Sequence, residues 1–366
     1  MKDYTLNFRY LRFVIILVIY LFTTNKAASQ RFYAVVFDKL PQDYQLYARN
    51  EFNEANVPIN GIIEFKDWNY MSVQVLRNGK PYAYKRAPIT YPKVGNGRFS
   101  VEIPIKAELA EYDFLVYAVK SPDSVLMVTR KNVVAGDVFL FSGQSNSYNG
   151  SENNRIYKGE FARSFGYSAD YINYATYNPA DTLWDIANNR PKVGLWASEF
   201  QRLMIEKYKI PICIINGGSG GSSMQYNMNR TNNPADLTTS SGRLYYRVKK
   251  AGLLENVKAF IYRQGEHDAN DNAGALIWKE SMIKHMEALK KEYPGLQQFY
   301  IPQINVLEGN QGNQGLVRES QRQLTASPLI KGFATIGTQG YDGVHYSPDG
   351  YFQSAAELFQ IGRAHV

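Results

Sequence analysis

Two different hydrophobic patterns divide the chain near Gly136. Between residues 32 and 134, short segments such as 71–76 and 99–103 alternate apolar and polar residues, and no long stretch has a helical period. Turn residues, including Asn78-Gly79, separate these segments. Alternation with a period of two is typical of half-buried strands. The pattern predicts a small β-sandwich-like accessory domain over residues 30–134.

After residue 136, apolar runs alternate with segments of helical spacing. The predicted strands are 138–141, 210–215, 260–262, 299–304 and 333–336, and the clearest predicted helices are 195–208 and 276–293. This alternation predicts an α/β domain over residues 135–360, with a parallel sheet covered on both faces. Active sites in such sheets lie beyond the carboxyl ends of the strands. The residues that follow each run are therefore the candidates for chemistry.

The N-terminus has the order of a secretory signal peptide. Lys2, Arg9 and Arg12 precede the apolar run 13–22, and a polar stretch with small residues follows. The run has about half the length that a membrane-spanning helix needs. We therefore expect cleavage of residues 1–29, no later membrane span, and a secreted or periplasmic location.

The last six residues, 361–366, have a sequence that resembles a translated sequencing adapter, and we expect them to be a non-native tail. The α/β domain would then be truncated inside a helix that begins near Ser354. His365 is set aside from the chemistry for this reason.

The net charge and the cysteine count exclude some functions and structural features. The formal net charge is +8 over 366 residues, and +5 without residues 1–29. Lys and Arg form no long stripe with interleaved aromatic residues, so nucleic-acid binding has little support. The single cysteine, Cys213, excludes an internal disulfide and lies in an apolar run, where we expect a packed core thiol.

Acyl transfer by a serine needs a base that accepts the hydroxyl proton and an acid that orients the base. His285 lies in a predicted helix among lysines, which predicts a solvated face. Asp342 precedes His345 by three positions on a predicted loop, where the carboxylate can fold back to the imidazole. Ser145 follows a predicted strand and a glycine, where a sharp turn exposes its hydroxyl.

Four motifs stand in a specific order along the α/β region. They are Gly143-Gln144-Ser145-Asn146, Gly220-Gly221-Ser222, Gln264-Gly265-Glu266 and Asp342-x-x-His345. From about residue 133 onward the chain resembles the SGNH hydrolase superfamily, and within it the sialate O-acetylesterases and family 6 acetyl xylan esterases. The resemblance implies a three-layer SGNH-type fold. It also implies a serine esterase, without cofactor, that removes O-acetyl groups from sialic acid or plant-type polysaccharide through an acyl-enzyme.

Position by position, the resemblance implies Ser145 as nucleophile, His345 as general base and then acid, and Asp342 as its orienting partner. The oxyanion would be held by the backbone N–H of Ser145, by that of Gly220 or Gly221, and by a polar side chain of the Gln264 block. The expected oxyanion and substrate-binding residues are Gly220, Gly221, Gln264, Gln144, Asn146, Glu266 and His267.

Two of these residues keep several interpretations. Glu266 could support His345, bind sugar hydroxyls or serve the loop structurally. His267 could contact substrate or be a satisfied polar residue beside Asp268. No further ligands follow these adjacent residues at a useful spacing, so no metal site is expected.

Two other functions compete with the esterase. A carbohydrate-binding protein with a vestigial site would be indicated by a lost catalytic residue, but Ser145, Asp342 and His345 are all present. The glycine-rich run 218–223 could instead bind a phosphate or nucleotide. It lacks the Lys-Ser/Thr ending of a P-loop, which argues against this function. The sequence leaves open the sugar, the role of the β-domain and the oligomeric state.

Overall fold

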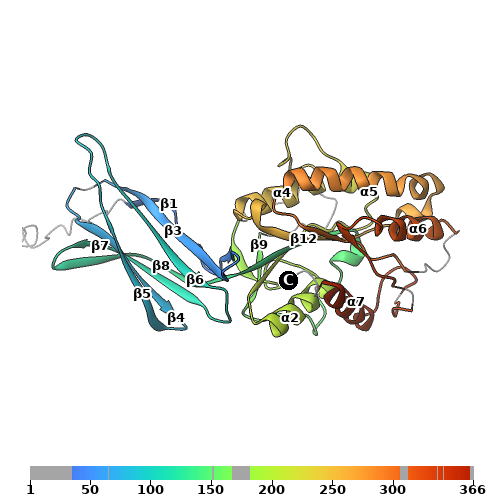
Figure 1. Ribbon diagram of the computed structural model, residues 1–366, viewed down its shortest axis with the longest axis horizontal. Coiled ribbons are helices and arrows are strands. Elements are labelled where there is room, and N and C mark those ends of the chain that lie inside the picture. The colour runs from blue at the N-terminus through green and yellow to red at the C-terminus, as the bar shows by residue number, and fades with distance from the viewer. Residues whose placement is uncertain are drawn as a thin grey trace, which may run out of the picture.

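The computed structural model describes residues 35–362, apart from 65, 151, 167–181, 306–311, 336 and 341. A strand-rich part and a part with helices around a sheet lie end to end along the long axis (Figure 1). The expected fold class, an α/β sheet preceded by a small β-domain, is confirmed. The expected signal peptide, residues 1–29, lies outside the described residues, as do residues 363–366.

The strand-rich part consists of two antiparallel sheets. β1 (Val35–Lys39), β3 (Glu54–Ile63) and β6 (Gly97–Lys106) form the first. β4 (Tyr70–Arg77), β5 (Lys80–Pro88), β7 (Tyr112–Lys120) and the start of β8 (Asp123–Gly143) form the second. Every second residue of β6 is buried, as the alternating pattern predicts. Asn78 and Gly79 both have positive φ and close the hairpin between β4 and β5.

One strand belongs to both parts of the molecule. β8 has 21 residues, which at about 3.3 Å per residue span roughly 70 Å. Its first half pairs with β7, β2 (Leu46–Ala48) pairs with it at residues 134–136, and its last residues pair with β11 and β12. The predicted domain boundary at 134/135 falls inside this strand, and the boundary itself stays a prediction.

The sheet of the α/β part has the strand order β10-β9-β11-β8-β12-β13-β14. β10 runs antiparallel to β9, and the other neighbours are parallel. The bounds are β9 (Ala162–Phe165), β10 (Trp184–Ile186), β11 (Ile212–Asn216), β12 (Val257–Arg263), β13 (Gln298–Tyr300) and β14 (Ile330–Lys331). The expected strand at 333–336 is wrong for residues 333–335, because the last strand ends at Lys331.

Helices cover both faces of this sheet (Figure 1). α2 (Leu195–Tyr208) and α7 (Pro348–Gly362) lie on one face, and α4 (Ser240–Lys250), α5 (Asn272–Glu292) and α6 (Gln314–Leu324) lie on the other. A short helix, α3 (Met224–Met228), follows β11. α2 has the predicted bounds. α5 begins four residues before the predicted start, since the Asp271 side chain caps it by accepting from Gly274 N–H. α7 begins at Pro348 rather than near Ser354.

Alternate residues of β8 point into two separate cores. Phe139 and Phe141 pack with α2, and Val138 and Leu140 pack in the core that contains Trp278 of α5. Cys213 is fully buried in the second core, and burial raises the pKa of its thiol. The expected packed thiol is confirmed.

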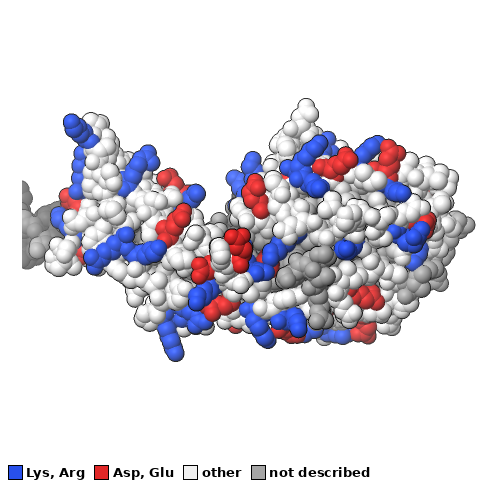
Figure 2. All heavy atoms as spheres, viewed as in Figure 1, with Lys and Arg blue, Asp and Glu red and all other residues white. Residues whose placement is uncertain are grey.

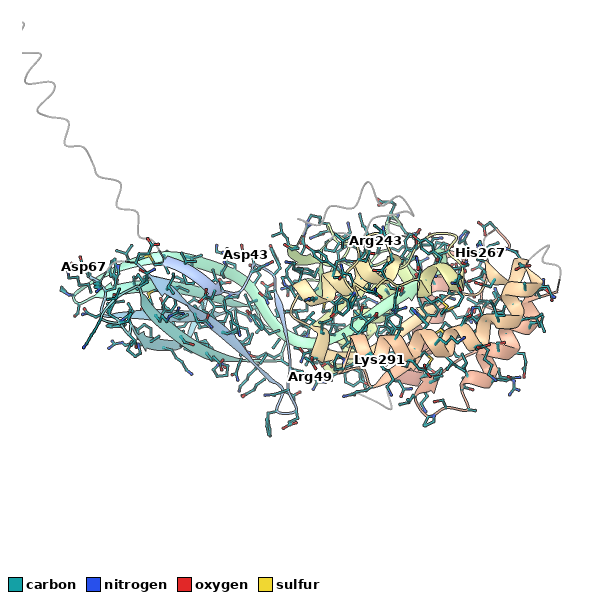
Figure 3. The ribbon with its side chains drawn as sticks, turned by 90° about the horizontal axis from the view of Figure 1, so that it is seen from above. Asp43, Arg49, Asp67, Arg243, His267 and Lys291 are labelled. Atoms are coloured by element: carbon teal, nitrogen blue, oxygen red, sulfur yellow. The ribbon has the colours of Figure 1, made fainter. Side chains whose placement is uncertain are left out.

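A buried carboxylate stabilises the start of the parallel sheet. Asp137 of β8 accepts two hydrogen bonds of 2.7 Å from the Arg49 guanidinium and lies 2.8 Å from Lys258 Nζ. Arg49 is labelled between the two parts of the molecule in Figure 3. This ion cluster therefore ties the segment after β2 to the α/β sheet.

The edge of the sheet at which β8 and its parallel neighbours end faces away from the strand-rich part. β8 enters the sheet from the strand-rich part, so its carboxyl end lies at the far side. Figure 3 shows His267, which follows β12, at the end of the molecule opposite Asp67.

Acidic and basic side chains are interspersed over the visible surface (Figure 2). Within the described residues, every helix is too short or too polar to cross a membrane.

Candidate active site

The turn that carries Ser145 is fixed by backbone contacts at the end of β8. Gly143 has φ of +130°, and a Cβ there would lie 1.9 Å from the Arg263 carbonyl oxygen. Gln144 N–H donates to that same oxygen at 3.0 Å. Ser145 then opens a short 3-10 helix, Ser145–Ser147. The strand therefore ends in a sharp turn that leaves the Ser145 side chain half-buried at the edge of the sheet.

Ser145, His345 and Asp342 form a continuous hydrogen-bonded chain. Ser145 Oγ lies 2.8 Å from His345 Nε2, and His345 Nδ1 lies 2.7 Å from Asp342 Oδ2. The other carboxylate oxygen of Asp342 accepts from the backbone N–H of Val344 at 3.0 Å and of His345 at 2.7 Å. The carboxylate is thus held by the loop that it orients.

The electrostatics of the Asp342 carboxyl favour its ionised form. Burial raises its pKa, but the hydrogen bonds from the His345 side chain and from the two backbone N–H groups outweigh burial and lower the pKa to about 2. The side chain is 43 % exposed and that of His345 is 31 % exposed. An ionised acid beside the imidazole keeps Nδ1 protonated and leaves Nε2 free to accept the serine proton.

The glycine-rich segment after β11 offers a restricted set of backbone donors. Gly218 N–H already donates to Asn216 Oδ1 at 2.9 Å, and Ser219 N–H donates to Gly143 O at 2.9 Å. Within the described part of the chain, the N–H groups of Ser145, Gly220 and Gly221 have no acceptor. Two of the expected oxyanion donors are therefore uncommitted, together with the backbone N–H of Ser145.

The Gln264 side chain lies beneath the site rather than facing it. It is fully buried, and its Nε2 donates toward Ser222 O at 3.1 Å and toward Asp268 Oδ2. Its Oε1 accepts from Trp278 Nε1 at 2.7 Å. Since both amide hydrogens have protein acceptors, the expected donation from Gln264 to an oxyanion has no support from this geometry.

Gln144 also faces inward. Its buried Oε1 accepts from the backbone N–H of His267 at 3.1 Å and of Gly265 at 3.3 Å. The side chain therefore joins the turn that carries Ser145 to the loop after β12. The His267 side chain is exposed at the outer end of the molecule, so it remains a candidate substrate contact (Figure 3).

Asn146 and Glu266 pair in the interior. Asn146 Nδ2 donates to Glu266 Oε1 at 2.6 Å and to Val344 O at 3.1 Å. Tyr351 Oη donates to Asn146 Oδ1 at 2.9 Å. Burial raises the pKa of the Glu266 carboxyl. Both residues lie under the loops that carry Ser145 and His345, where neither side chain is accessible to a sugar.

Asn216 is a polar residue at the site to which the sequence motifs assign no role. Its Nδ2 donates to Ser147 O at 2.8 Å and Val193 O at 2.7 Å, and its Oδ1 accepts from Gly218 N–H. It joins the turn that carries Ser145, the segment before α2 and the glycine-rich segment. A polar amide directly after the apolar run 210–215 is the signal that could have indicated it.

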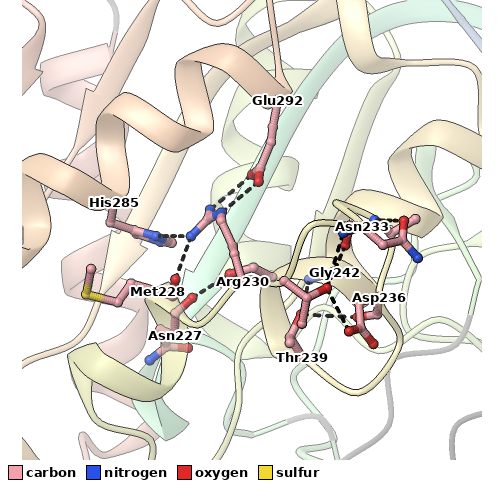
Figure 4. Close-up of polar contacts among 12 residues, drawn as sticks. Asn227, Met228, Arg230, Asn233, Asp236, Thr239, Gly242, His285 and Glu292 are labelled. Carbon is pink, nitrogen blue, oxygen red and sulfur yellow. Dashed lines mark hydrogen bonds and ion pairs between the residues drawn. The ribbon is translucent and has the colours of Figure 1, made fainter.

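The expected solvated face at His285 is wrong. His285 is buried against the rings of Phe260 and Tyr262. Its Nδ1 lies 2.9 Å from Arg230 Nη1 (Figure 4). Arg230 also pairs with Glu292 at 2.6 Å. Burial, and then the Arg230 charge, hold the pKa of His285 well below its usual range. This cluster ties the asparagine-rich segment after α3 to α5.

The α/β part of the chain matches a known protein family. Residues 135–361, more than half of the chain, match the family model described as carbohydrate esterase, sialic acid-specific acetylesterase. No curated protein matches the chain.

Two of the solved structures that match the chain come from esterases. A novel carbohydrate acetylesterase from Xanthomonas citri is similar with a TM-score of 0.58 and 19 % identity, over 91 % of this chain and 75 % of that one. An acetyl xylan esterase from the rumen bacterium Butyrivibrio proteoclasticus has a TM-score of 0.36 and 12 % identity, over 91 % of this chain and 98 % of that one. The first of these likenesses supports the fold, and the family match supplies the assignment. The chain belongs to the carbohydrate esterase family of sialic acid-specific acetylesterases.

Proposed function

We propose that this carbohydrate esterase is a serine enzyme that removes O-acetyl groups from sialic acid or plant-type polysaccharide through an acyl-enzyme. The observation that carries the proposal is the chain Ser145 Oγ–His345 Nε2–Asp342, with distances of 2.8 and 2.7 Å. A serine hydroxyl becomes a competent nucleophile only when a positioned base accepts its proton.

Acylation follows from this geometry. Ser145 Oγ attacks the acetyl carbonyl carbon while its proton passes to His345 Nε2. The negative charge on the carbonyl oxygen is stabilised by the N–H groups of Ser145 and Gly220, and Gly221 is the alternative second donor. Removal of one such donor typically costs about 3 kcal/mol of barrier. The intermediate then breaks its bond to the sugar oxygen, and His345 returns the proton to that oxygen.

Deacylation repeats the same proton path with water. Water attacks the acetyl-Ser145 ester and gives a proton to His345. Collapse of the second intermediate releases acetate and restores the Ser145 hydroxyl with the proton from His345. Asp342 stabilises the imidazolium that forms in both halves of the reaction and remains ionised throughout.

The openness of the site supports a bulky carbohydrate as the substrate. The His345 side chain is 31 % exposed and that of Asp342 is 43 % exposed, at a sheet edge turned away from the strand-rich part. An ester on a large glycan can reach such an edge without entering an enclosed cavity. We also propose that the protein is exported to meet this substrate and that the chemistry needs no metal or cofactor.

The test is hydrolysis of p-nitrophenyl acetate, followed by acetate release from acetylated xylan and O-acetylated sialic acid, by the protein and its Ser145→Ala variant. We expect the variant to lose about 10⁴- to 10⁶-fold in kcat, as other serine hydrolases do. Equal rates from two folded proteins would contradict the proposal and favour the competing function, a carbohydrate-binding protein with a vestigial site.

A further inference from the structure

Arg263, the last residue of β12, carries a charge that is fully removed from solvent. All three of its guanidinium nitrogens are buried without a hydrogen-bond partner in the described structure. The guanidinium carbon lies 4.1 Å from the Tyr346 ring centre and 4.5 Å from that of Trp196, with Tyr351 at 5.9 Å. Aromatic faces attract a desolvated cation but leave its N–H donors unsatisfied.

Glu266 is a second buried residue in this region with an unsatisfied polar atom. Its Oε1 accepts from Asn146, whereas its buried Oε2 has no partner within the described residues. Burial raises the pKa of Glu266, and the nearby charge of Arg263 acts in the opposite direction. A buried charge is costly unless an opposite charge and hydrogen bonds compensate it. The nearby Arg263 charge therefore offsets part of the cost of an ionised Glu266.

This cluster contacts both catalytic loops. Asn146 is the neighbour of Ser145, and it reaches Glu266 and the carbonyl of Val344. Tyr346 is the neighbour of His345, and its ring covers the Arg263 guanidinium. Through Asn146 and Tyr346, the two buried residues thus contact the sequence neighbours of Ser145 and His345.

We propose that Arg263 and Glu266 form a buried charge pair, joined by water between their unpaired atoms, that positions Ser145 and His345. The inference rests on the proposed function. Water fits the chemistry better than an anion does, because it can donate to Glu266 Oε2 and accept from the guanidinium. An anion in the same place would meet the negative charge of Glu266.

The charge balance around Glu266 predicts a pH effect. Arg263 and Tyr262 face it from β12, His345 from the catalytic loop and Tyr351 from α7. Burial raises the pKa of both tyrosines, so both stay neutral. In Glu266→Gln, the uncompensated Arg263 charge disfavours the imidazolium of His345. The acid limb of the pH–rate profile then moves to lower pH, and the added change Arg263→Met moves it back.

The kinetic test compares Arg263→Met, Glu266→Gln and the double variant. Each single change is expected to lower kcat about 10- to 100-fold with little change in KM, because small misplacements of reacting groups have effects of this size. The double variant should be no worse than the poorer single variant. Arg163→Met is the control, since Arg163 is another fully buried arginine but pairs with Glu111 away from the site. It should lower Tm and leave kcat of the folded protein unchanged.

A second measurement separates this inference from the proposed function. The His345 imidazole is titrated by NMR in the Ser145→Ala background, which requires no turnover, with His345→Gln assigning the signal. A midpoint that falls in Glu266→Gln and returns in the double variant supports the pair even if the protein proves inactive. An unchanged midpoint in Glu266→Gln, or single-variant losses in kcat that multiply in the double variant, would overturn it.

Discussion

The backbone of Gly143 lies against the carbonyl oxygen of Arg263, where a Cβ would approach to 1.9 Å. This contact joins the ends of β8 and β12, the two strands that carry the nucleophile turn and the Gln264 loop. The positive φ of Gly143 starts the turn that presents Ser145. Two independent constraints, steric and conformational, therefore require glycine at this position.

Gly143→Ala should disrupt the nucleophile turn. The strained φ and the contact with the backbone of Arg263 together are expected to lower the free energy of unfolding by about 3 kcal/mol or more. Urea denaturation and kcat on p-nitrophenyl acetate measure the effect. Gly315→Ala in α6 is the matched control, because nothing lies within 4 Å of its Cβ position. Full activity and stability in Gly143→Ala would contradict the turn geometry.

Asp342→Asn should leave the fold intact and lower kcat about 10⁴-fold, because the amide no longer stabilises the imidazolium or fixes its tautomer. The variant also tests whether ionisation of Asp342 contributes to the stability of the fold. The pKa of Asp342 is lowered from 3.8 to about 2, so its ionised form stabilises the fold above pH 3.8, and this contribution disappears as the pH falls through 2. Denaturation between pH 2 and pH 4 should show a weaker pH dependence in the variant. An identical dependence in both proteins would argue against the hydrogen bonds of Asp342.

Asn216→Ala should loosen the oxyanion segment. The change removes the hydrogen bonds that Asn216 donates to Ser147 O and Val193 O and the one that it accepts from Gly218 N–H. Backbone groups at the site are then left without partners. We expect a loss of about 1–3 kcal/mol in the free energy of unfolding. A fall in kcat larger than the rise in KM would show that the loss acts on the transition state. Asn189→Ala, an exposed amide, is the control and should change neither quantity.

His285 should make the stability of the fold sensitive to pH. Its pKa in the folded protein lies well below the unfolded value of 6.5. The unfolded chain then binds the extra proton, so stability is complete above pH 6.5 and decreases as the pH falls below it. Replacement by glutamine in His285→Gln keeps an acceptor for Arg230 and removes the titration. Thermal unfolding between pH 5.5 and 7 should be flatter in the variant, and parallel curves would exclude this role of His285.

Features that depend on local pattern can be predicted from the sequence. The spacing of apolar residues places α2 at Leu195–Tyr208, and the motifs identify Ser145, Asp342 and His345, which form one hydrogen-bonded chain. Strand ends of a parallel sheet converge on one edge, so residues far apart in the chain can be assigned to one site from the sequence alone.

Features that depend on tertiary packing cannot be predicted from such local patterns. The expected solvated face at His285 is wrong because its lysine neighbour at position 284 points about 100° away around the helix, whereas the buried Ser281, Met282 and Leu289 share its face. The continuity of β8 through both parts is hidden because its two halves differ in burial, the first exposed or half-buried and the second fully buried. Motif membership likewise does not show that Gln264 and Asn146 point inward.

The most direct test of the serine mechanism is to trap the acyl-enzyme. The protein is mixed with p-nitrophenyl acetate, quenched in acid within the first turnovers, digested and examined by mass spectrometry. We expect an acetyl group on the peptide that contains Ser145, and neither acetylation nor turnover in a folded Ser145→Ala protein. Turnover without an acetylated Ser145, at the same rate in both proteins, would contradict the mechanism.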